Sequence, residues 1–183
     1  MGKLFVISGS SGVGKGTVIA EFIKKHPEFK LSVSCTTRAK REGETEGKNY
    51  FFLSKEEFNK CIKNDEFLEW AEFSGNCYGT KKEFVENCLK NGENLILEID
   101  TKGALNVKRI MPEAKLIFIL PPSLEELEAR LRGRHTETEE AIKKRLASIK
   151  SEIENSKHYD YTVVNDTVEN AVKTLEEIIF HKE

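Results

Sequence analysis

The sequence predicts an α/β fold in which helices cover both faces of a mostly parallel, doubly wound sheet. Three observations carry this prediction: short apolar runs recur along the chain, helical patterns fall between them, and a glycine-rich loop directly follows the first run. Strands buried on both faces are typically continuous apolar runs. The runs are LFVI (4–7), LSVS (31–34), LILEI (95–99), LIFIL (116–120) and YTVV (161–164).

The helices between these runs are indicated by apolar spacing and by N-terminal caps. Apolar side chains share one side of the segment Thr17–Lys25, and Ala104–Ile110 follows the third run. The pairs Ser54/Glu57 and Ser123/Glu126 have the spacing of capping boxes and predict two further helix starts. A last stripe predicts a helix that packs against the core; it consists of Ile142, Leu146, Ile149 and Ile153.

The loop after the first run, Gly9-x4-Gly14-Lys15, has the spacing of a phosphate-binding loop. We expect Gly9, Gly12 and Gly14 to allow backbone conformations that a Cβ would forbid, so that N–H groups turn toward an anion. The following helix adds its positive end, and Lys15 adds a full charge. Gly16 stands where the pattern normally has a serine or threonine that binds magnesium, and Thr17 follows one place later. The alternative interpretation of the whole loop is a glycine-rich turn with a purely architectural role.

Composition limits the remaining classes of function. A chain of 183 residues, 38% hydrophobic, can bury a core as one domain. A net charge of −2 argues against a nucleic-acid surface. The absence of a long apolar run argues against a membrane span, and the early first strand against a signal peptide, so we expect a cytoplasmic protein. The four cysteines and four histidines lack metal-ligand spacing and are interpreted as ordinary residues.

Two segments interrupt the alternation of strand and helix. Cys35–Thr80 contains the aromatic runs YFF and FLEWAEF and predicts a small, partly β lobe inserted into the core. Gly133–Glu140 is polar, has arginines at its edges and predicts a lid. Arg38 and Arg41 follow the second apolar run, where forked guanidinium groups would match a dianionic phosphate; a solvated loop is the alternative.

Taken together, four segments resemble the guanylate kinase family, which phosphorylates GMP from ATP. The resemblance covers nearly the whole chain in the right order, which makes it more specific than the phosphate loop alone. The segments are VSCTTRAKREGETEGKNYFF, FLEWAEFSGNCYGT, LILEIDTKGA and LRGRHTETEEAIKKRL.

The resemblance implies one phosphate-loop NTPase-like domain over 1–183 with an inserted GMP-binding lobe and a helical lid. The lobe would span about 34–80 and the lid about 125–149. The core would consist of about 1–33, 81–124 and 150–183.

The resemblance also implies the GMP-binding residues. Those that hold the phosphate would be Ser34, Arg38, Arg41, Tyr50 and Tyr78. Glu69 and Thr80 would read the base, and Asp100 would serve either guanine or hydrated magnesium. Guanine offers two adjacent N–H donors and a carbonyl acceptor, which a carboxylate and a hydroxyl complement. Adenine would place the lone pair of a ring nitrogen against the carboxylate. A site in which the wrong analogue leaves a buried polar group unpaired can reject that analogue by roughly 10⁴-fold.

ATP and Mg²⁺ are the implied co-substrate and cofactor. Lys15, Arg41, Arg134 and Arg145 would be the catalytic residues. Magnesium would be held mainly by ATP phosphates and water, with Thr17 and Asp100 as candidate ligands. Asn165 and Asp166 match a family position near the adenine of ATP, but the alternative is that they form only the turn into the last helix. The implied ATP-binding set is Gly9, Ser11, Gly12, Val13, Gly14, Lys15, Gly16, Thr17, Arg130, Asn165 and Asp166.

Two other functions are compatible with parts of the pattern. One is a phosphate-loop kinase for another acceptor, such as AMP, CMP or a sugar phosphate. The other is a guanylate-kinase-like module that binds phosphorylated peptides without catalysis, although such modules typically have degraded phosphate loops and this chain keeps Lys15. The expected partners are therefore GMP, with dGMP as a second acceptor, and ATP, with no nucleic acid, membrane or obligate protein partner.

Overall fold

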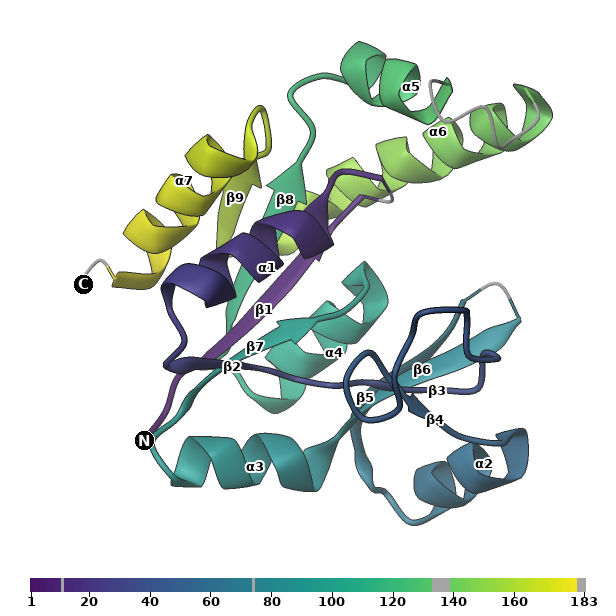
Figure 1. Ribbon diagram of the computed structural model, residues 1–183, viewed down its shortest axis with the longest axis vertical. Helices are drawn as coiled ribbons and strands as arrows, with labels where there is room; N and C mark the ends of the chain where they lie inside the picture. The colour runs from purple at the N-terminus through teal and green to yellow at the C-terminus, as the bar shows by residue number, and fades with distance from the viewer. Residues whose placement is uncertain (11, 74, 133–138, 181–183) are drawn as a thin grey trace.

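The protein is described by a computed structural model of residues 1–10, 12–73, 75–132 and 139–180. Within 124–132 and 139–155 it describes only some of the side chains. Its strands form two sheets (Figure 1). The strands are β1 (Leu4–Gly9), β2 (Phe29–Leu31), β3 (Cys35–Thr36), β4 (Phe51–Phe52), β5 (Phe67–Phe73), β6 (Asn76–Lys81), β7 (Asn94–Glu98), β8 (Lys115–Leu120) and β9 (Tyr161–Val164). The helices are α1 (Lys15–Lys25), α2 (Lys55–Lys63), α3 (Lys82–Lys90), α4 (Thr101–Ile110), α5 (Leu124–Arg132), α6 (Glu139–Asn155) and α7 (Val168–Phe180), with a 3-10 turn at Ser156–His158.

The main sheet has the order β2-β7-β1-β8-β9, and every pair in it is parallel. Its central strand, β1, is buried from Leu4 to Ser8. Because all five strands run the same way, their carboxyl ends meet at one edge, where the glycine-rich loop leaves β1. The predicted doubly wound parallel sheet is confirmed.

Helices cover both faces of this sheet, as predicted. Successive side chains of a strand point to opposite faces, so Phe5 and Ile7 belong to the cluster under α1 and α7. Leu4 and Val6 belong to the other cluster, under α3 and α4. Figure 1 shows α1 and α7 side by side on their face of the sheet. The buried sheet therefore fixes the position of the loop at its edge.

The strand predicted at 31–34 has the wrong bounds. β2 begins at Phe29, which is 3% exposed, and ends at Leu31, which is 38% exposed. After one more bond from Ser32 N–H to Ile96, the chain leaves the main sheet, and the Ser34 carbonyl accepts a hydrogen bond from Phe51 in the second sheet. The apolar run therefore spans the crossing between two sheets.

The second sheet has the order β4-β3-β6-β5 and occupies the region predicted to be a partly β lobe. Its β3/β4 pair is parallel, and the β3/β6 and β5/β6 pairs are antiparallel. It has a small core of its own with α2, formed by Cys35, Phe58, Cys61 and Phe67.

Local caps at two helices agree with the sequence. Ser54 accepts a hydrogen bond from Glu57 N–H at 3.1 Å, and Glu57 accepts one from Ser54 N–H at 2.7 Å, so the predicted capping box starts α2. Ser123 accepts a hydrogen bond from Glu126 N–H at 3.0 Å before α5. Both helices therefore begin where the sequence predicts.

The apolar stripe predicted on α6 is helical, but it packs in a small cluster of its own with α5 rather than in the main core clusters. On α6, Ile149 is fully buried and packs with Leu146, Ile153 and Leu124 of α5. Arg132 of α5 also forms an ion pair with Glu139 of α6. The predicted lid stretch lies mostly outside the described residues, which resume at 139.

Two further features concern the whole described chain. All four cysteines are free thiols. Among the described residues, the helices are too short or too polar to cross a bilayer.

We expect Phe58→Ala to lower the free energy of unfolding by about 3 to 5 kcal/mol. Phe58 is fully buried, and its ring centre lies 4.5 Å from that of Phe67. The control is Phe73→Ala in β5 of the same lobe, where the residue is 59% exposed and the expected change is within about 0.5 kcal/mol. Urea unfolding followed by circular dichroism measures both; equal losses would contradict the assignment of Phe58 to a core.

Candidate active site

The loop between β1 and α1 has the backbone geometry of an anion cradle. Gly12 and Gly14 have φ angles of 82° and 89°, in the left-handed region that favours glycine. Gly14 is the N-cap of α1, and its carbonyl accepts hydrogen bonds from Thr17 and Val18, both at 3.1 Å. The positive end of α1 therefore opens at the carboxyl edge of the main sheet, where an anion is favoured.

Gly9 has a different role from the one predicted. Its φ lies outside the left-handed region, so the expectation of a conformation forbidden to other residues is wrong there. A Cβ on Gly9 would lie 2.8 Å from the carbonyl oxygen of Ile119 and 3.1 Å from Cγ1 of Val13. Gly9 is thus required by the close approach of β8 and of the buried Val13 side chain.

Lys15 has a carboxylate neighbour that the sequence analysis missed. Its Nζ lies 3.8 Å from Oε1 of Glu98, the last residue of β7, and the two side chains are 21% and 36% exposed. A Cβ on Gly16 would lie 3.7 Å from the same oxygen, so Glu98 borders the loop. The available signal was an acidic residue that ends an apolar strand beside β1.

Asn165 supports the loop from the end of β9. Its side-chain amide is buried and donates a hydrogen bond to the Val13 carbonyl at 2.7 Å. Asp166 is exposed and accepts hydrogen bonds from Thr167 N–H and from the Asn170 amide at the start of α7. Both residues therefore have structural partners, and their contact with ATP stays a prediction.

The phosphate-binding residues predicted for the lobe gather around Arg38. Its guanidinium group donates to both carboxylate oxygens of Glu44, at 2.7 and 3.1 Å. It also lies 5.4 Å from the ring centre of Tyr50 and 5.9 Å from that of Phe52. The rings of Tyr50 and Tyr78 are 6.0 Å apart. The hydrogen bond to Glu44, and then one to Tyr78, raise the pKa of Arg38.

Tyr50 belongs to the aromatic group around Arg38 and also responds to the charge of Glu98. Burial raises the pKa of Tyr50, and the negative charge of Glu98 raises it further. Tyr50 is thus within electrostatic reach of the carboxylate beside Lys15. Arg41 is exposed, and its N–H donates to Glu44 at 2.8 Å; Ser34 is half-buried.

Glu69 and Thr80 form the buried polar pair of the site. The Thr80 hydroxyl donates to Oε1 of Glu69 at 2.7 Å, and the two residues are 1% and 7% exposed respectively. Burial raises the pKa of Glu69 to about 7; the Thr80 hydrogen bond lowers it and the charge of Asp100 raises it. Asp100 caps α4 by accepting a hydrogen bond from Gly103 N–H at 2.7 Å. Two carboxyl groups thus lie together at the carboxyl end of β7.

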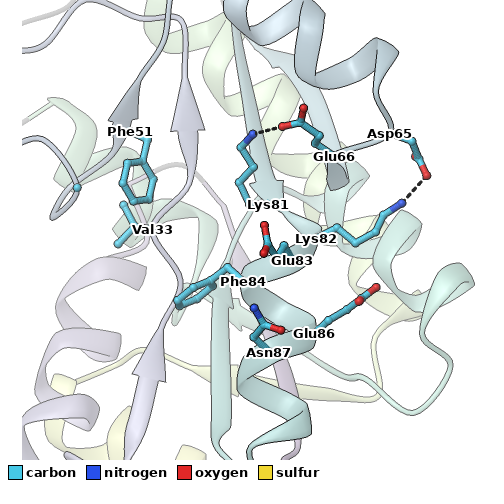
Figure 2. Close-up of a pocket in the computed structure, with 11 residues that line it drawn as sticks. Val33, Phe51, Asp65, Glu66, Lys81, Lys82, Glu83, Phe84, Glu86 and Asn87 are labelled. Atoms are coloured by element: carbon cyan, nitrogen blue, oxygen red, sulfur yellow. Dashed lines mark hydrogen bonds and ion pairs between the residues drawn. The ribbon is translucent and has the colours of Figure 1, made fainter.

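A separate hollow of about 730 Å³ is lined by residues of the lobe and of α3 (Figure 2). Val33, Phe51 and Phe84 provide its apolar surface. Its lysines are already paired, Lys81 with Glu66 and Lys82 with Asp65. Phe51 lines this hollow while its neighbours Tyr50 and Phe52 face Arg38, because alternate residues of a strand point to opposite faces. This hollow is therefore distinct from the cluster around Arg38.

Comparison with known proteins identifies the family of this site. The sequence model of the guanylate kinase family matches residues 1–182. The chain belongs to the guanylate kinase family.

Curated guanylate kinases and a solved structure agree with this family. The guanylate kinase of Synechococcus sp. (strain CC9311) is 53% identical over 93% of this chain and 90% of its own. That of Caldanaerobacter subterraneus subsp. tengcongensis is 52% identical over 97% of this chain and 86% of its own. The crystal structure of guanylate kinase from Anaplasma phagocytophilum superposes with a TM-score of 0.81 at 35% identity, covering 97% of this chain and 84% of that one.

Some residues that the guanylate kinase resemblance implied are not placed. Ser11 and Arg134 lie outside the described residues. The backbones of Arg130 and Arg145 lie in α5 and α6, but their side chains are also outside the described part. Their roles stay predictions.

The buried carboxyl group of Glu69 should make stability depend on pH. Its pKa of about 7 lies above its ordinary value of 4.5, so its stabilising contribution is complete below pH 4.5 and is lost as the pH rises through 7. Glu69→Gln lacks this dependence. We expect the stability of the variant relative to the parent to increase by about 3 kcal/mol between pH 4.5 and 8, measured by urea unfolding. Parallel stability curves would contradict this.

Proposed function

We propose that the chain transfers the γ-phosphoryl group of ATP to GMP or dGMP, with the residue roles given below. The observation that carries this proposal is the buried Glu69/Thr80 pair, held at the same sheet edge that bears the phosphate loop. A buried acceptor and hydroxyl suit a purine, a cluster of arginine and tyrosines suits its phosphate, and an anion cradle suits the phosphates of a second nucleotide.

Base recognition would depend on the ionised form of Glu69. The N–H donors of guanine need a carboxylate as acceptor, and the Thr80 hydroxyl can rotate toward the guanine carbonyl. With a pKa of about 7, Glu69 is partly protonated near neutral pH when the base is absent. Guanine would favour the ionised form, so GMP binding would release a proton. Adenine would not provide these donors and would leave buried groups unpaired.

The phosphate of GMP would bind between Arg38 and the two tyrosines. In the structure Glu44 holds the Arg38 guanidinium in a fork, so a phosphate would meet a group that is already oriented. Exposed Arg41, anchored through its N–H to Glu44, can add a second charge. The hydroxyl groups of Ser34, Tyr50 and Tyr78 would donate hydrogen bonds to the same phosphate. These roles are the ones that the family resemblance implies.

ATP would lie with its outer phosphates over the glycine-rich loop, against the N–H groups and Lys15. Magnesium, when bound, compensates negative charge on these phosphates. Carboxylate and hydroxyl oxygens suit this ion. The Glu98 carboxylate beside Lys15 could bind the magnesium ion directly or through a water molecule. Thr17 is exposed in the first turn of α1, so its hydroxyl is a second candidate ligand. Asp100 is engaged as the cap of α4, which favours its role near the base over a metal role.

Transfer between two anions needs alignment and charge compensation more than proton transfer. The acceptor phosphate is already ionised near neutral pH, so no general base is required. Arg41 and Lys15 would compensate charge at the acceptor and donor sides, and Arg130, Arg134 and Arg145 would close over the transferring group. The reaction belongs in the cytoplasm, where both nucleotides and magnesium are available.

Lys15→Met should lower kcat/KM for ATP-dependent GMP phosphorylation by at least about 10²-fold, because a preorganised charge is lost beside the transferring group. Lys24→Met is the control, since Lys24 lies on the same helix with a side chain that is 76% exposed. A coupled assay of ADP formation with GMP, dGMP, AMP, CMP and a sugar phosphate measures both activity and acceptor choice. Normal turnover of Lys15→Met, or preference for another acceptor in the parent protein, would contradict the proposal.

Glu69→Gln should lower kcat/KM for GMP by about 10²- to 10⁴-fold while leaving the KM for ATP nearly unchanged, because an amide presents a donor to the guanine N–H groups. Gln has nearly the same size, so the fold should be kept, which thermal melting checks. Initial rates with each substrate varied in turn separate the two effects. A variant impaired only in ATP use would show that Glu69 does not read the base.

A further inference from the structure

Gly103 lies where the two carboxyl groups of the base site meet. It is the third residue of α4, and its N–H donates to Oδ1 of Asp100 at 2.7 Å. It is buried, and β5, which carries Glu69, packs against α4. One residue thus contacts both carboxyl groups, through its N–H on one side and its bare Cα on the other.

The space beside this Cα is filled by Glu69. A Cβ on residue 103 would lie 2.5 Å from Oε2 of Glu69, 3.1 Å from its Cδ and 3.4 Å from Oδ1 of Asp100. Contacts below about 3 Å are repulsive between non-bonded atoms of this kind. The closest atom is the end of a side chain rather than backbone, so Glu69 would move before the fold did.

The backbone does not explain the glycine. Its φ lies outside the left-handed region, and alanine is the better helix former at an ordinary helical position. The requirement at this position is therefore space for the carboxyl group of Glu69.

We propose that Gly103 is a positioning residue that fixes the Glu69 carboxyl group for guanine recognition and thereby sets base specificity. This inference rests on the proposed function. In the structure the Thr80 hydroxyl donates to one oxygen of Glu69 at 2.7 Å. When that hydroxyl turns toward guanine, the space beside Gly103 still fixes the position of the other oxygen. A side chain at residue 103 would push the second oxygen away from the plane in which the base presents its donors.

The direct test is Gly103→Ala in the full chain. We expect the KM for GMP to rise about 10- to 100-fold, since a displacement of about 1 Å in a positioned group can cost 10²-fold. The KM for ATP and the melting temperature should stay near those of the parent, and the preference for GMP over AMP should fall. Asn106→Ala, which adds alanine at an exposed position of the same helix, is the control and should change none of these quantities.

A size exchange tests whether the clash is with Glu69. Glu69→Asp shortens the side chain by one methylene and should itself raise the KM for GMP. In the double variant with Gly103→Ala the shorter acid leaves room for the new methyl group. We therefore expect a KM at least 3-fold below the product of the two single effects, a non-additivity that marks direct contact.

The outcomes separate this inference from the proposed function. If the parent protein does not phosphorylate GMP, the proposed function fails. If the parent is active and Gly103→Ala keeps its KM for GMP, the inference is overturned. Loss of the fold in Gly103→Ala, an equal rise of both KM values, or additive effects in the double variant would also overturn it, because each would assign the glycine to general packing.

Discussion

The parallel arrangement of the main sheet determines where the groups around the glycine-rich loop can lie. Because β1, β7 and β9 all end at the same edge, their next residues share one surface. The loop from β1, Glu98 at the end of β7 and Asn165 after β9 follow from that direction. Reversing one strand would carry its terminal residue to the far edge, about 15 to 20 Å away for a strand of usual length.

The second sheet brings in the groups that the main sheet does not provide. Its strands are short, and its core is small and separate. Yet β5 packs against α4, which itself begins at the carboxyl end of β7. Through this contact, Glu69 reaches the sheet edge although it belongs to the other sheet. The two sheets of this chain therefore meet at the start of α4.

The sequence was sufficient for the parts that depend on local pattern. The central strands β1, β7 and β8, the caps at Ser54 and Ser123 and the left-handed glycines of the loop depend on neighbouring residues, and they were predicted. The runs 31–34 and 161–164 were also expected to be buried on both faces, but the first leaves the main sheet and the second forms the edge strand β9, in which Val164 is 48% exposed. The residues around the base were found through family resemblance, because Glu69 and Asp100 meet only in three dimensions. Glu98 was missed, and Gly9 was misjudged, since the carbonyl of Ile119 that crowds it is distant in sequence.

The fork between Arg38 and Glu44 has a consequence for which anions the site accepts. The guanidinium group already has a monovalent partner within its own segment, with the two side chains only 13% and 18% exposed. Glu44 therefore holds the guanidinium group in place before any anion arrives, so binding an anion there costs little ordering of a long side chain. Under the proposed function, such a fixed fork suits a doubly charged phosphate ester, whose several oxygens can accept from it, better than a single spherical ion such as chloride.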